Sequence, residues 1–117
     1  MNIGNKTYGF KLTVGASIQI AKLCPDGDLG RIAEAVGGTY GHQAEALAKM
    51  ISALSNGYAA AEAFEGREAA RLTPEDVLAL DPKTFEEVTK EAFAAFRADV
   101  SGELEVKPTK KAAAPSR

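Results

Sequence analysis

The sequence has few of the residues from which disulfide frameworks, zinc sites and membrane spans are built. Its 117 residues include one cysteine, one histidine and no tryptophan. One cysteine cannot form an internal disulfide, and together with one histidine it cannot supply the usual ligand set of a zinc site. No apolar run approaches the ~18 residues of a membrane helix, and the first residues lack the apolar stretch of a secretion signal. We therefore expect a protein of a reducing compartment that carries no metal or other cofactor.

The charge balance also restricts the class of partner. The chain has 14 Lys and Arg residues against 16 Asp and Glu residues, which gives a net charge of −2. A balance of this sign provides no extended basic surface for a nucleic acid. Hydrophobic residues make up 45% of the chain and charged residues 26%, which is ordinary for a globular domain. The composition predicts one globular domain and contains nothing that points to an enzyme.

The beginning of the chain has the alternation of a β-hairpin. We predict strands at residues 2–4 and 7–13, separated by a tight turn. Tyr8, Phe10 and Leu12 lie on one face of the second strand, because side chains alternate with a period of two. A two-stranded hairpin is barely stable alone, so this apolar face must pack on the rest of the domain.

The remainder of the domain has helical spacing of its apolar residues. Thr13, Asp28 and Thr73 stand where helix N-caps are expected. Val14 and Ile18 belong to the apolar stripe of the first helix. The predicted helices span residues 14–24, 29–36, 42–64, 74–80 and 82–102. The fold class is therefore mainly α, a small single-domain helical bundle with an N-terminal β-hairpin.

Two glycine positions mark expected irregularities in the longest helices. Asn56-Gly57 interrupts the strongest helical pattern and predicts a kink or a frayed end there. Gly102 is expected to end the last helix. From residue 103 the chain becomes rich in Lys, Pro and Ala and cannot bury enough surface to offset its ordering entropy. We therefore predict a helical domain over residues 1–102 and a disordered tail over residues 103–117.

Candidate catalytic and metal-binding residues have ordinary structural explanations. Asp26-Gly27-Asp28 lacks the further oxygen ligands of a calcium loop, so we expect a turn followed by a helix cap. His42 has no Ser, Cys or carboxylate at the spacing of a catalytic pair. Cys24 lies at the end of an apolar helix, where we expect a buried and unreactive thiol. We assign no catalytic residue and no metal ligand.

The apolar stripes carry more hydrophobic surface than short helices need, although all of it could belong to the core. Amphipathic tyrosines and clustered phenylalanines are typical of interfaces with a partner helix. The candidate partner-binding residues are Tyr8, Phe10, Leu54, Tyr58, Phe93 and Phe96.

Two parts of the chain carry a family resemblance. The first is YGFKLTVGA at residues 8–16, followed by LCPDGD at residues 23–28. The second is LTPEDVLAL at residues 72–80, followed by EAFAAF at residues 91–96. Both parts resemble the tail assembly chaperones of long-tailed phages, siphovirus-like or myovirus-like, and of Gram-positive prophages. The resemblance is one of pattern over most of residues 3–100, and no site residue can be transferred individually.

The resemblance implies a non-catalytic protein of the host cell cytoplasm. Such chaperones bind the tape measure protein, keep it soluble and are displaced as tail tube protein polymerises around it. No small-molecule substrate or membrane is implied, and the chain could also form a homo-oligomer. Two alternatives stay open: a small structural virion subunit of the head–tail joining type, and a nucleic-acid-associated protein that uses the basic tail.

Overall fold

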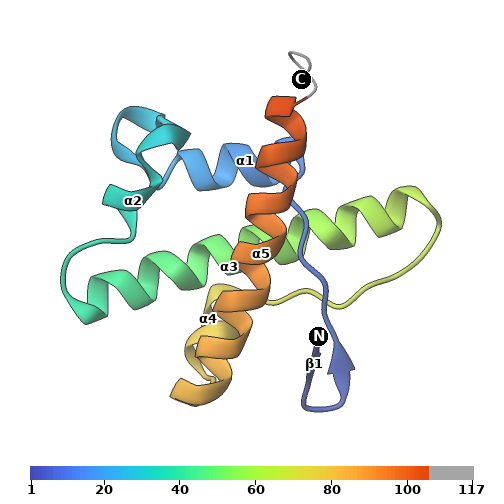
Figure 1. Ribbon diagram of the computed structural model, residues 1–117. Helices are drawn as coiled ribbons and strands as arrows, with labels where there is room; N and C mark the ends of the chain where they lie inside the picture. Colours follow the sequence, from blue (N-terminus) through green and yellow to red (C-terminus); the bar gives the residue numbers. More distant parts are fainter. Residues whose placement is uncertain (106–117) are drawn as a thin grey trace.

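The chain is mainly helical and begins with a β-hairpin, as the sequence predicts. The computed structural model describes residues 1–105, with side chains to residue 100, and most of the predicted tail (residues 106–117) lies outside the described residues. Figure 1 shows the order of the elements. They are β1 (Asn2–Ile3), β2 (Lys6–Thr7), α1 (Val14–Ala21), η1 (Pro25–Gly27), η2 (Leu29–Arg31), α2 (Ile32–Ala35), α3 (Tyr40–Phe64), α4 (Pro74–Leu78) and α5 (Pro82–Glu105).

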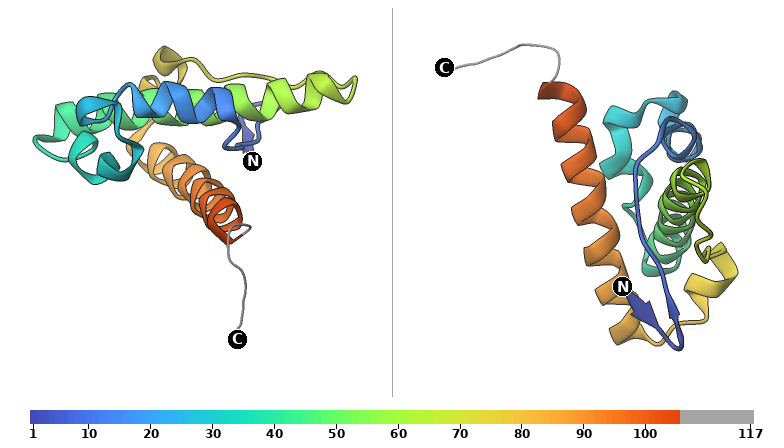
Figure 2. Two further views of the ribbon diagram at one scale, coloured as in Figure 1. Left: turned by 90° about the horizontal axis from the view of Figure 1, so that it is seen from above. Right: turned by 90° about the vertical axis from the view of Figure 1, so that its right-hand side faces the viewer.

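The elements are stacked in layers around α3. In both views of Figure 2, α1 and α2 lie beside α3, while α5 lies on one side of this layer and α4 with its preceding loop on the other. α5 crosses α3 steeply rather than running along it (Figure 1). The largest fully buried side chains come from α1, α3, α4 and α5, so the core sits where the layers meet. They are Ile20, Met50, Ile51, Leu54, Val77, Val88 and Ser55.

The hairpin is shorter than the alternation predicted. β1 and β2 pair antiparallel with Asn2 opposite Thr7, and Gly4 takes the positive φ of 63° that the tight turn requires. The main chain after residue 8 leaves the hairpin and crosses α3 instead of pairing with a strand. The Lys11 N–H donates to the Leu54 carbonyl oxygen (3.0 Å), and the Leu12 N–H donates to an Asp99 carboxylate oxygen (2.9 Å). The period-two pattern indicated an extended main chain but could not indicate these partners.

The predicted caps are confirmed by their hydrogen bonds. The Thr13 hydroxyl accepts from the Ala16 N–H (3.1 Å), and the Asp28 carboxylate accepts from the Gly30 N–H (2.9 Å). Thr73 forms a reciprocal capping box with residue 76 at the start of α4. The cap residues therefore place the helix starts, and these starts agree with the sequence pattern.

The helix ends differ more from the prediction. α1 ends at Ala21 and passes through tighter turns before Pro25, and the predicted helix over 29–36 divides into η2 and α2. The expectation that Gly102 ends the last helix is wrong, because α5 continues to Glu105. One glycine costs a helix only about 1 kcal/mol, and neighbouring backbone hydrogen bonds can offset that cost.

Gly57 does not interrupt α3, which is continuous from Tyr40 to Phe64. It lies instead where residues 8–13 cross the helix. A Cβ at Gly57 would collide with the Lys11 carbonyl oxygen and would lie 3.0 Å from the Thr13 hydroxyl. The glycine therefore allows the extended segment to lie directly on the helix backbone.

Candidate partner-binding site

The structure separates the six predicted partner-binding residues into two groups. Leu54 is fully buried and Phe96 is only 9% exposed, and both belong to the hydrophobic core. A partner cannot reach these two side chains in the free protein, so their assignment to a binding surface is corrected to the core. Tyr8, Phe10, Tyr58 and Phe93 are half-buried. The sequence pattern marked all six as apolar-face residues, but it could not tell a core contact from an accessible one.

Two of the half-buried aromatic residues lie in the same hollow. Phe10 and Tyr58 both line a depression of about 450 Å³ between residues 8–13, α3 and α5. The Tyr58 ring occupies the space that a side chain at position 9 would fill, so Gly9 is required for this contact. Arg67 bonds Glu62 at the rim (2.8 Å) and holds the pKa of the Glu62 carboxyl below its ordinary value. The depression is thus lined by both charged side chains and two aromatic ones.

Phe93 has a different role from Phe10 and Tyr58. Its ring meets the Phe96 ring edge to face, with centroids 6.1 Å apart and an interplanar angle of 72°. Phe93 is half-buried, and it covers the buried Phe96. It therefore lies at the margin of the core, where part of its ring is accessible to a partner.

The most exposed apolar residues of α1 were assigned to the wrong face by the sequence pattern. Val14 is 74% exposed and Ile18 is 52% exposed, whereas Ala16 and Ile20 are buried. Ala16 lies against α3, because its Cβ is 3.2 Å from the position that a Gly57 Cβ would take. Ala16 and Ile20 therefore face the core, and Val14 and Ile18 on the opposite face of α1 point outward. The sequence does contain a signal for the alternative core face, because the apolar residues of α1 lie on two opposite faces.

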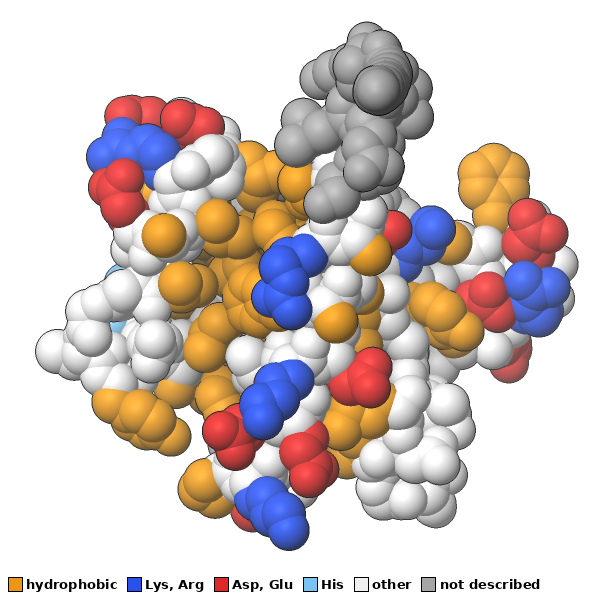
Figure 3. Space-filling model, viewed as in Figure 1, with side chains coloured by type: hydrophobic (Ala, Val, Ile, Leu, Met, Phe, Trp, Pro, Cys, Tyr) orange, Lys and Arg blue, Asp and Glu red, His pale blue; other side chains and the backbone are white. Residues whose placement is uncertain are grey.

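Hydrophobic side chains are also exposed beside α5. Figure 3 shows hydrophobic side chains gathered in a hollowed region between α5 and the elements α1 and α2. α2 contributes the half-buried Ile32 and Val36 to the margin of the core, and α5 contributes Phe93. We call the exposed side chains of Val14 and Ile18 on α1 the apolar face. Other exposed apolar residues, such as Phe64 at 94%, stand at the ends of helices.

Cys24 is buried and Asp28 caps η2, as the sequence predicted. Burial raises the pKa of the Cys24 thiol, with the Asp28 carboxylate adding to the rise. Asp26 pairs with Arg31 (2.9 Å), and Asp28 caps η2. The two carboxylates therefore have separate partners and do not share a site that could hold a cation. Within residues 1–105, no group of three or more His, Cys, Asp or Glu side chains could hold a metal ion.

The helices of residues 1–105 are also too short or too polar to cross a membrane. Comparison with protein families, with curated proteins and with solved structures gave no match to this chain.

Proposed function

We propose that this chain is a non-catalytic phage tail assembly chaperone that binds an apolar helical stretch of a tape measure protein. The observation that carries the proposal is the outward-facing stripe of α1, with Val14 at 74% and Ile18 at 52% exposure. The motifs at residues 8–16 and 72–80 that resemble these chaperones support the same function.

The shape of the apolar face suits a helix. An amphipathic helix binds by laying its apolar stripe against a hydrophobic surface, and the exposed side chains of Val14 and Ile18 provide a surface of this kind. Ile18 and Val14 are four residues apart on one helix face, which matches the spacing of a partner stripe. β-branched side chains lose little rotamer freedom when a partner covers them. Contiguous apolar surface on a protein marks sites of association more often than chance exposure does.

The experiment that tests this proposal is co-expression of the full chain with a phage tape measure protein. We expect the tape measure protein to aggregate when expressed alone and to stay soluble in a complex with this chain. Finished tails should then contain the tape measure protein without this chain, because polymerising tube protein displaces a chaperone. Solubility of the tape measure protein that is unaffected by this chain would contradict the proposal, and retention of the chain in finished tails would indicate a structural subunit.

A further inference from the structure

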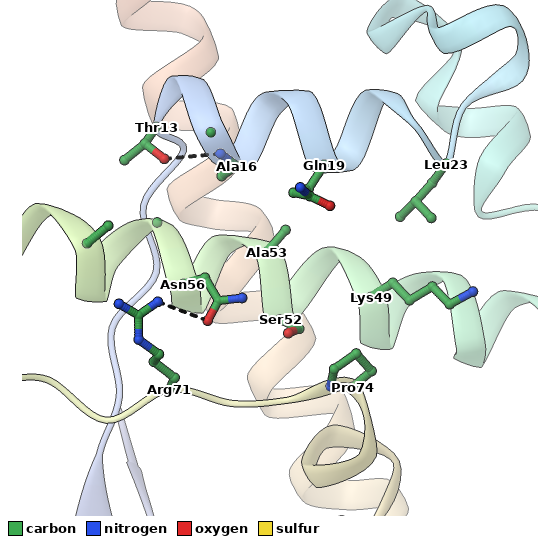
Figure 4. Close-up of a pocket in the computed structure, with 13 residues that line it drawn as sticks. Thr13, Ala16, Gln19, Leu23, Lys49, Ser52, Ala53, Asn56, Arg71 and Pro74 are labelled. Carbon is green, nitrogen blue, oxygen red and sulfur yellow. Dashed lines mark hydrogen bonds between the residues drawn. The ribbon is translucent and has the colours of Figure 1, made fainter.

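A second groove runs along α3, beside α1. Figure 4 shows it between α1 and the loop that ends at Pro74, with α3 as its floor. The groove has a volume of about 540 Å³. The α3 residues that line it include four small ones. They are Ser52, Ala53, Gly57 and Ala60.

The charges around this groove are all of one sign. Lys49 and Arg71 line it, and no Asp or Glu does, although the chain as a whole carries a net charge of −2. One Arg71 nitrogen donates to the Asn56 side-chain oxygen (3.3 Å), which holds the guanidinium at the groove. Among residues 1–100, neither Lys49 nor Arg71 forms an ion pair. Both cations are therefore free to bind a carboxylate that enters the groove.

A buried hydroxyl also points to a polar occupant. Ser52 is 5% exposed and lines the groove. The hydrogen bonds among residues 1–100 do not include its hydroxyl, whereas the equally buried Ser55 hydroxyl accepts from the Leu72 N–H (2.9 Å). Buried polar groups are nearly always hydrogen-bonded, and leaving one without a partner costs free energy. A peptide N–H or C=O in the groove would supply the missing partner.

We propose that this groove binds an extended, acidic peptide segment of a partner protein. Small side chains on the segment fit the floor, its main chain bonds Ser52, and two carboxylates bond Arg71 and Lys49 at the two ends of the groove (Figure 4). A helix of ~10–12 Å diameter is too wide to reach the floor between the two walls, whereas an extended chain is narrow enough to do so. Positions 49 to 60 of α3 extend over roughly 16 Å at ~1.5 Å per residue, which matches about five extended residues. The site is separate from the apolar face and does not rest on the proposed function.

The test is an NMR titration of the full-length chain with a blocked hexapeptide of sequence Ser-Val-Asp-Ala-Glu-Ser. We expect saturable shifts of the backbone amides at Ser52, Asn56 and Gly57, with a Kd of about 1 mM or below. Arg71→Gln should weaken this binding about tenfold, because it removes a charge-assisted hydrogen bond. Arg97→Gln is the matched control, since it removes an exposed cation from α5, and it should leave the Kd unchanged. A peptide with lysine in place of both acidic residues should not bind.

Three results would overturn the proposal. The first is the absence of saturable shifts, or equal binding of the lysine peptide. The second is an unchanged Kd for Arg71→Gln in a variant whose spectrum shows a native fold. The third is a shift of the same amides with protein concentration alone, which would make the groove a contact between copies of this chain. A Ser52→Ala variant adds a further check, because it should weaken peptide binding while leaving the melting temperature unchanged or raised.

Discussion

The crossing of residues 8–13 over α3 predicts an inverted response to a common stabilising substitution. Gly→Ala inside a helix normally stabilises it by about 1 kcal/mol. At Gly57 the added methyl group would collide with the Lys11 carbonyl oxygen and crowd Thr13 at 3.0 Å and Ala16 at 3.2 Å. Because the first of these neighbours is main chain, the extended segment must move to make room.

The magnitude follows from the contacts that this movement breaks. Overpacking a tight contact costs about 1–3 kcal/mol. Displacing the Lys11 N–H from the Leu54 carbonyl removes a hydrogen bond of 3.0 Å, which is worth about 1 kcal/mol. After the helix-propensity gain is subtracted, Gly57→Ala should destabilise the domain by about 2 kcal/mol. For a domain of this size that corresponds to a decrease of roughly 10 °C in melting temperature.

The assay is thermal and urea unfolding of the full chain followed by circular dichroism. Gly41→Ala is the matched control, because it lies in the same helix and its Cβ would meet nothing within 4 Å. This control should be as stable as the native chain or slightly more stable. A Gly57→Ala variant with native or higher stability would refute the proposed close contact between the segment and the helix.

Three further predictions concern single side chains. Cys24 should react slowly with a thiol reagent in the native state and rapidly in urea, because it is buried and its pKa is raised; rapid native labelling would contradict its burial. Hydrogen bonds from Thr73 hold the pKa of Asp76 below its ordinary 3.8, so this carboxylate adds stability above that pH and loses it as pH falls below. Asp76→Asn should therefore lower stability near pH 6, and this difference should shrink as the pH falls below 3.8, as measured by urea unfolding; a pH-independent difference would show that the charge is irrelevant. Phe96→Ala should cost about 3–5 kcal/mol, whereas Phe64→Ala should be nearly neutral, because only Phe96 is in the core.

Three helix starts were predictable because their cap residues act locally, whereas α3 begins at Tyr40 behind the Thr39 cap and not at the predicted residue 42. Thr13, Asp28 and Thr73 bond backbone N–H groups only two or three residues away, so a short stretch of sequence contains the whole interaction. The helix ends were less predictable. Gly102 carries the sequence signal of a helix stop, yet α5 continues past it.

The direction of the helix faces needed the three-dimensional structure. On α1 the sequence shows apolar residues on two faces, and the predicted apolar stripe follows the face of Val14 and Ile18. The choice between the faces depends on Gly57, 41 positions beyond Ala16, because only a small residue of α1 fits against α3 there. Leu54 and Phe96 also lie on predicted helical stripes. Such a stripe indicates an apolar face, but not whether the core of the same chain or a partner protein covers it.

The most direct test of the chaperone proposal is the affinity of the purified chain for the tape measure protein, with Ile18→Lys and Phe64→Lys compared. Both residues are exposed and lie in the last turn of a helix, where a lysine is well tolerated, so both variants should fold. Only Ile18 belongs to the apolar face. We predict that Ile18→Lys weakens binding at least tenfold and that Phe64→Lys binds as the native chain does. Full-strength binding by a folded Ile18→Lys variant would contradict the assignment of the apolar face as the chaperone's binding surface.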